Sequence, residues 1–205
     1  MLKHITIEGV RNLAHTQVAL PPGATVLFGA NGSGKTSFLE AIHLLAVGRS
    51  FRTHQSKPVI QHGGAHCRVV GEVQRGRRSI VMGLEKHRDG GVKARVGGEN
   101  VPSLSELALH LPLVLLDTEG LGIVNGPPEG RRRLLDGTLF HVEQGFLSQW
   151  KRYALAVRQR NSGLRRGILS SDKAWRQEIS ETGTLLTQQR QAVAEKLADE
   201  LARLV

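Results

Sequence analysis

Residues 29–36 read Gly-Ala-Asn-Gly-Ser-Gly-Lys-Thr, which matches the G-x-x-x-x-G-K-[ST] pattern of phosphate-binding loops. Glycines at three of these positions let the backbone turn tightly and direct successive N–H groups at phosphate oxygens. The lysine brings a positive charge to the terminal phosphates, and the threonine hydroxyl suits Mg²⁺. This stretch therefore predicts a nucleotide site in an α/β fold.

The residues on either side of the loop support this interpretation. Thr25–Phe28 is a short apolar run that predicts a buried strand, and Ser37–Leu45 has apolar residues at helical spacing. The loop would then lie at a helix N-terminus, where the partial positive charge attracts phosphate. This context argues against the alternative, a glycine-rich turn that matches the motif by chance. The predicted nucleotide-binding residues here are Gly29, Ala30, Asn31, Gly32, Ser33, Gly34, Lys35, Thr36 and Ser37, with Thr36 also the Mg²⁺ ligand.

Composition restricts the class of protein. The 205 residues suffice for one large or two small domains, and no apolar run has membrane-spanning length. A single cysteine, Cys67, excludes an internal disulfide and fits a cytoplasmic location. The net charge of +10 favours a polyanionic partner, most often nucleic acid, although a solubilising surface is the alternative.

The pattern along the chain predicts two parts. Residues 1–130 form an expected phosphate-loop lobe, with strands over Leu2–Val10 and Leu113–Leu116 and a β-rich antiparallel insertion at about 60–100. Between them, Ser103 and Glu106 predict a short helix with a capping box. Residues 131–205 carry apolar residues at helical and partly heptad spacing, which predicts an antiparallel helical pair that is truncated at its C-terminus.

A second acidic motif offers an alternative function. Asp117 follows the apolar run Leu113–Leu116, as an Mg²⁺-binding aspartate would, and Asp117–Gly120 reads D-x-x-G. This pattern favours a self-contained GTPase or kinase with Asp117 on Mg²⁺. However, no N-K-x-D guanine-reading motif follows, and Gly126-Pro-Pro leads instead into three arginines. Asp117 is therefore the less favoured candidate ligand.

Several motifs in one order resemble a known family. Arg11-Asn12 precedes the phosphate loop, and Leu39–Ile42 and Gly48-Arg-Ser-Phe-Arg52 follow it. Gly126-Pro-Pro then precedes Arg131-Arg132 and Leu135-Asp136, and Gln159-Arg-Asn161 and Leu164-Arg165 come last. Over essentially its whole length, the chain resembles the N-terminal portion of the RecF family of bacterial recombination and repair ATPases.

The resemblance implies a fold and a set of partners. It implies an α/β fold, namely an ABC-ATPase-like head lobe with an antiparallel β subdomain and a helical-hairpin arm. It further implies ATP and Mg²⁺ as cofactors, double-stranded and gapped DNA as ligand, and action in replication, repair and the SOS response. RecR, with the RecO pathway, and an ATP-dependent homodimer are the implied protein partners, and no membrane is involved. Arg11 and Asn12 match a turn that lies beside the nucleotide in related heads, although a simple turn with a surface arginine is the alternative.

Basic residues supply candidate DNA contacts, because phosphate contacts position a duplex without reading its sequence. The candidates are Arg49, Arg52, Lys57, Arg75, Arg77, Arg78, Arg131 and Arg132. A solvated basic surface is the alternative for each of them.

The chain also departs from the family pattern. Neither a signature segment nor a Walker B acidic pair occurs in it, and Thr118 stands where the family usually has proline. The resemblance therefore implies weak ATPase activity in a complete protein and negligible hydrolysis by this chain. It leaves open a module in which ATP only stabilises a DNA- or partner-binding surface, without hydrolysis.

Overall fold

The computed structural model describes residues 1–53, 55–116, 125–143, 145–167, 170 and 172–204. The chain divides into two compact units, residues 1–114 and residues 115–205. The domain boundary expected near residue 130 lies inside helix α4 (Pro128–Val142).

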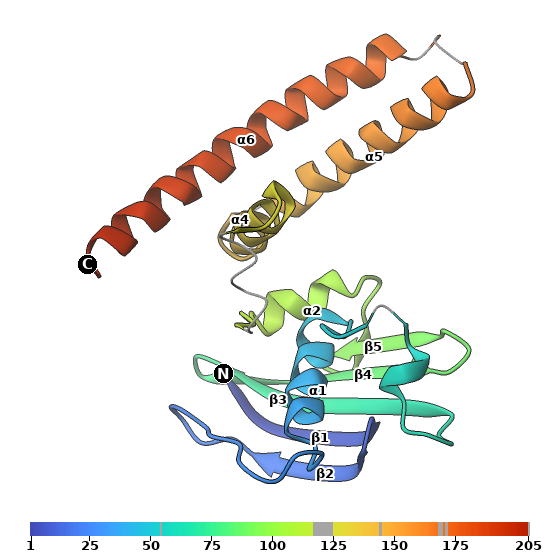
Figure 1. Ribbon diagram of the computed structural model, residues 1–205, viewed down its shortest axis with the longest axis vertical. Helices are drawn as coiled ribbons and strands as arrows, with labels where there is room; N and C mark the ends of the chain where they lie inside the picture. The colour runs from blue at the N-terminus through green and yellow to red at the C-terminus, as the bar shows by residue number, and fades with distance from the viewer. Residues whose placement is uncertain (54, 117–124, 144, 168–169, 171, 205) are drawn as a thin grey trace. The chain divides into compact units, whose positions relative to one another are not determined.

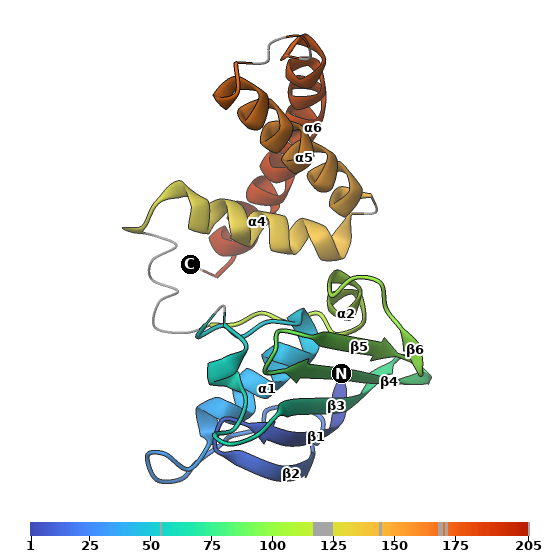
Figure 2. The ribbon, with the colours of Figure 1, turned by 90° about the vertical axis from the view of Figure 1, so that its right-hand side faces the viewer.

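The first unit is built on one antiparallel sheet (Figures 1 and 2). The strands follow the order β2-β1-β3-β4-β5-β6, so a β1–β2 hairpin pairs with a β3–β6 meander. Their bounds are β1 Leu2–Val10, β2 Leu13–Ala19, β3 His66–Arg75, β4 Arg78–His87, β5 Val92–Val96 and β6 Glu99–Asn100. The predicted first strand and the antiparallel insertion are confirmed.

Helix α1 (Lys35–Val47) lies across one face of this sheet, and α2 (Ser105–His110) packs beside it (Figure 1). Alternate residues of β1 and β3, such as Ile5, Ile7 and Val69, are buried against Leu44 and Leu45 of the helix. Each fully buried aliphatic side chain contributes about 1.5–3 kcal/mol, so this interface anchors the helix that begins at the phosphate loop.

Two predicted strands do not form. Thr25–Phe28 and Leu113–Leu116 pair with no strand that the structure describes. Leu27 and Leu113 pack against the hydrophobic core, whereas other apolar side chains of these segments face outward: Val26 is 80% exposed, Phe28 91% and Leu116 87%. Apolar content alone does not make a strand, because each strand needs a hydrogen-bonded neighbour. The described strands all belong to the antiparallel sheet, which offers these two segments no neighbour.

The predicted capping box is also wrong. Helix α2 begins at Ser105 with Leu104 as its N-cap, and no side chain caps it. The Ser103 hydroxyl instead pairs with the Ser105 hydroxyl, while the Glu106 amide bonds to the Ser103 carbonyl. A local backbone turn thus takes the place of the predicted side-chain cap.

The second unit is helical, as predicted, and its described residues include α4, α5 (Phe146–Arg165) and α6 (Asp172–Ala202), one helix more than the predicted pair (Figure 1). Helices α5 and α6 form an antiparallel hairpin. The helical spacing expected from residue 131 onward is interrupted before α5, where Gly145 adopts a φ of 85° as N-cap. Arg190 of α6 donates two hydrogen bonds to Asp136 of α4 (2.7 and 2.9 Å). None of the described helices has the length and apolar character needed to span a bilayer.

Gly71 sets how closely α1 approaches the sheet. A Cβ at Gly71 would lie 2.5 Å from Leu45 Cδ2 and 2.8 Å from Leu2 Cδ1, whereas one at Gly83 of the neighbouring strand meets nothing closer than 3.8 Å. We expect Gly71→Ala to lower the free energy of unfolding by about 1–3 kcal/mol, through overpacking. Gly83→Ala is the matched control and should change it by about 0.5 kcal/mol or less. Denaturant titration measures both, and equal effects would contradict this packing account.

Candidate nucleotide-binding site

The phosphate loop ends at the first residue of α1. Gly29, Gly32 and Gly34 have φ values of 148°, 81° and 100°, a region that side chains disfavour. Gly34 is the N-cap of α1, and no side chain caps this end of the helix. The first amides of the helix therefore remain available to an anion, and the helix dipole adds partial positive charge there. The Lys35 ammonium donates to the carbonyls of Gly29 and Ala30 (2.7 and 2.9 Å), folded against its own loop.

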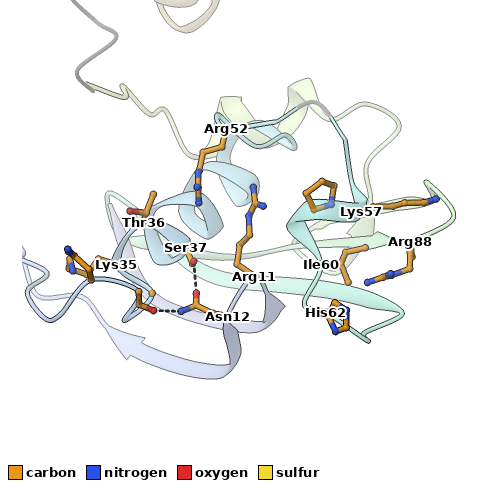
Figure 3. A pocket seen from close by; sticks show the side chains of 14 residues that line it. Arg11, Asn12, Lys35, Thr36, Ser37, Arg52, Lys57, Ile60, His62 and Arg88 are labelled. Atoms are coloured by element: carbon orange, nitrogen blue, oxygen red, sulfur yellow. Dashed lines mark hydrogen bonds between the residues drawn. The ribbon is translucent and has the colours of Figure 1, made fainter.

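Asn12, in the β1–β2 turn, connects this loop to the helix. Its amide nitrogen donates to the Gly32 carbonyl (2.7 Å), and its amide oxygen accepts from the Ser37 hydroxyl (2.7 Å) (Figure 3). The side chain thus holds the middle of the loop and the first turn of α1 at a fixed spacing. The neighbouring Arg11 has a φ of 55°, an uncommon backbone conformation for a residue with a side chain.

Arg11 is held by a buried carboxylate. Its Nε and Nη2 donate to Glu40 of α1 at 2.9 and 2.8 Å, and Glu40 is fully buried. The Ser50 hydroxyl also donates to Glu40, and Arg52 Nη1 lies 3.8 Å from the same carboxylate. Burial raises the pKa of Glu40, but the hydrogen bonds from Arg11 and Ser50 outweigh it and leave that pKa below its usual value. The carboxylate therefore stays ionised at neutral pH.

These groups border a cavity of about 860 Å³ (Figure 3). This volume lies within the range of ligand sites. The lining includes five cationic side chains and, among the described residues, no carboxylate; the cations are Arg11, Lys35, Arg52, Lys57 and Arg88. Such a lining suits a polyphosphate.

Residues 57–62 form the far side of the cavity. The sequence analysis assigned none of them to nucleotide binding and named only Lys57, as a candidate DNA contact. Pro58, Ile60 and His62 line it, together with Arg88 at the end of β4. The Arg11 amide bonds to the Val59 carbonyl (2.8 Å) and the Gln61 amide to the Gly9 carbonyl (2.8 Å), so this segment is attached to the β1–β2 hairpin. Arg88 Nε also donates to the Gly64 carbonyl (3.0 Å). No local motif marks these residues, and only tertiary pairing brings them to the phosphate loop.

Most of the predicted nucleotide residues gather in the cavity. Its lining contains Arg11, Asn12, Asn31, Gly32, Gly34, Lys35, Thr36 and Ser37. Gly29, Ala30 and Ser33 shape the loop, where the Ser33 amide donates to the Ala30 carbonyl (3.2 Å). Asp117, the alternative Mg²⁺ ligand, lies outside the described residues, as do Thr118 and Glu119.

The predicted DNA contacts do not gather on one surface. Arg52 and Lys57 line the cavity, and Arg49 follows the end of α1, where its carbonyl contacts His43 Nδ1 (2.6 Å). Arg75, Arg77 and Arg78 surround the β3–β4 turn. That turn lies about 30 Å along the strands from Arg88 at the cavity, at ~3.3 Å per residue.

The remaining two candidates, Arg131 and Arg132, belong to α4 in the second unit. Arg131 donates to the Gly126 carbonyl (3.0 Å).

Comparison with known protein families identifies the family of this chain. The model of the RecF/RecN/SMC N-terminal domain matches residues 1–170. The chain belongs to this family. One curated relative is the DNA replication and repair protein RecF of Stutzerimonas stutzeri, which is 44% identical over 87% of this chain and 49% of the relative. Another is the DNA replication and repair protein RecF of Marinomonas sp., which is 39% identical over 100% of this chain and 56% of the relative. These RecF relatives confirm the resemblance inferred from the motifs. The chain spans about half the length of the curated relatives it matches.

Solved structures give the same assignment. The recombination mediator protein RecF-ATP of the RecFOR pathway superposes with a TM-score of 0.85 at 25% identity, over 96% of this chain and 54% of that one. An Smc head domain with an extended coiled coil from Pyrococcus furiosus has a TM-score of 0.56 at 16% identity, over 97% of this chain and 58% of that one. This likeness to RecF and SMC heads confirms the predicted ABC-ATPase-like α/β fold.

The Asn12 contacts generate a prediction. We expect Asn12→Ala to weaken nucleotide binding about tenfold, equivalent to ~1.4 kcal/mol, because the loop loses its two side-chain connections. Isothermal titration with MgATP measures the loss. The control variant is Gln17→Ala, at an exposed residue of the same hairpin, and it should leave the affinity for MgATP unchanged. Equal affinities for Asn12→Ala and the unsubstituted protein would show that the turn does not organise the loop.

The Glu40–Arg11 pair predicts a pH dependence. The pKa of Glu40 is lower in the folded protein than the ordinary 4.5, so the pair contributes its full stability above pH 4.5 and loses it as the pH falls through the folded-state pKa. Glu40→Gln removes this titration. Its free energy of unfolding should therefore fall less steeply on acidification than that of the unsubstituted protein, as measured by denaturant titration at several pH values. Parallel pH profiles would contradict this expectation.

Proposed function

We propose that this chain is the nucleotide-binding part of an ATP-dependent DNA-binding protein of recombinational repair and replication-fork maintenance. The complete protein acts at single-strand gaps and dimerises when it binds ATP. One observation carries the proposal: the phosphate loop opens into a cavity of about 860 Å³ with five cationic side chains. Its relatives' description as DNA replication and repair proteins supplies the DNA context.

The two ends of the cavity would bind different parts of the nucleotide. Loop amides, Lys35 and the start of α1 would hold the phosphates, and the Thr36 hydroxyl would hold Mg²⁺, which neutralises phosphate charge. Pro58 and Ile60 provide apolar surface for a base, with His62 and Arg88 as polar neighbours. ATP is the proposed nucleotide, since a solved relative of the same fold is described as RecF-ATP.

The remaining half of the protein completes the site in this proposal. The chain spans about half of its relatives, and Val26 and Phe28, beside the phosphate loop, are 80% and 91% exposed. Large apolar side chains that are exposed close together favour burial by another segment. We assign that cover to the rest of the protein, which would also supply acidic groups for hydrolysis. A second copy would close over the ATP in the dimer.

The basic residues outside the cavity are the proposed DNA contacts. Arg75, Arg77 and Arg78 gather at one hairpin turn, a compact positive surface that suits phosphates. RecR, with the RecO pathway, is the proposed protein partner, and the SOS response is the proposed setting. The cytoplasm is the proposed location.

Binding to a gapped duplex tests the proposal. Fluorescence anisotropy of the full-length protein should show tight binding with ATP and weaker binding with GTP or without nucleotide. Lys35→Met should abolish the ATP effect, because the terminal phosphates lose their cation. Binding that ignores both the nucleotide and Lys35 would contradict an ATP-controlled DNA clamp.

Salt dependence tests the hairpin surface separately. Replacing Arg77 and Arg78 by alanine should weaken DNA binding and reduce the slope of log K against log salt by about one for each arginine that binds a phosphate. Lys93→Ala, an exposed lysine on β5, is the matched control and should leave the slope unchanged. An unaltered slope in the double variant would remove this hairpin from the DNA surface.

A further inference from the structure

Glu40 is a buried carboxylate beside a cavity that suits anions. Its side chain is fully buried, although an isolated buried charge is costly and a negative charge near phosphates is unfavourable. The sequence interpretation assigned it no role in the site. We propose that Glu40 is a positioning residue of the nucleotide site, which acts through Arg11 and Ser50 to fix two segments of the cavity wall. The inference rests on the proposed nucleotide binding.

The first segment is the β1–β2 turn. Glu40 accepts from both Nε and Nη2 of Arg11, a bidentate geometry that fixes the guanidinium plane. A guanidinium has five N–H donors, so about three of them are not used in the contact with Glu40, and Arg11 lines the cavity. The pair also holds Arg11 at its positive φ of 55°, and the next residue, Asn12, is thereby placed against Gly32 and Ser37.

The second segment follows α1. The Ser50 hydroxyl donates to Glu40 and accepts from the amides of Arg52 (2.9 Å) and Thr53 (3.2 Å). This local turn fixes the backbone that carries Arg52 to the cavity. Glu40 itself lies on α1, the helix that begins at the phosphate loop. One carboxylate therefore connects the helix, the hairpin turn and the following loop, three segments that border one cavity.

Electrostatics alone and positioning predict opposite effects. Removal of a negative charge near the cavity should by itself strengthen the attraction of an anion. If Glu40 acts by positioning, its loss weakens nucleotide binding, because Arg11 and the Asn12 connection become mobile. A purely structural role would lower stability and leave the affinity of the folded protein unchanged.

The test is isothermal titration of full-length protein with MgATP, at a temperature where every variant is folded. We expect Glu40→Gln to weaken affinity about tenfold, the effect of losing a charge-assisted hydrogen bond. Arg11→Lys should weaken the affinity to a similar extent, because lysine keeps the net charge but cannot form the bidentate hydrogen bonds to Glu40. Glu85→Gln is the matched control: it breaks the Arg68–Glu85 pair (2.8 and 2.6 Å) on the same sheet and should leave affinity unchanged.

Hydrogen exchange of the nucleotide-free variants gives a second readout. Amides of residues 29–34 should exchange faster in Glu40→Gln and Arg11→Lys than in Glu85→Gln. Unchanged or increased MgATP affinity in Glu40→Gln or Arg11→Lys would overturn the inference, as would unchanged exchange in this loop. If the unsubstituted protein bound no MgATP, the proposed function would fail instead. If Glu40→Gln did not fold, Ser50→Ala would take its place, and unchanged affinity in Ser50→Ala or Arg11→Lys would overturn the inference.

Discussion

The bidentate contact between Arg11 and Glu40 is the interaction on which the geometry of the site depends. It joins the β1–β2 hairpin to α1, and the loss of Arg11 would leave the buried Glu40 carboxylate with the Ser50 hydroxyl and a more distant cation, Arg52 at 3.8 Å. Asn12, next in the chain, then reaches the phosphate loop, while backbone bonds from Gly9 and Arg11 place residues 59–61. The nucleotide cavity is thus assembled around a turn in the sheet, and the glycine-rich loop is one of its walls.

Packing against the sheet explains why the β1–β2 turn has a fixed position relative to α1. Helix α1 packs on buried residues of β1 and β3, and Gly71 permits its close approach. Both the helix N-terminus and the hairpin are therefore fixed to the same hydrophobic core. A site whose parts share one core does not need the ligand to assemble it, which lowers the entropic cost of binding.

Local patterns predicted much of this arrangement. The phosphate loop, the helix after it and the antiparallel meander have strong short-range signals, and the Arg11-Asn12 turn followed from the family resemblance. Residues 25–28 and 113–116 were wrongly predicted as strands, because apolar content does not reveal whether a hydrogen-bonding neighbour exists. The capping box failed because Ser103 found a competing partner in Ser105. Pro58, Ile60, His62 and Arg88 have no motif, so their place in the cavity required the tertiary structure.

The central claim is that residues 29–37 and 57–62 form one nucleotide site, and hydrogen exchange mass spectrometry with MgATP tests it most directly. The account predicts that MgATP protects amides in both segments of the full-length protein and in neither segment of Lys35→Met. Protection confined to other parts of the protein, or protection that persists in Lys35→Met, would contradict it.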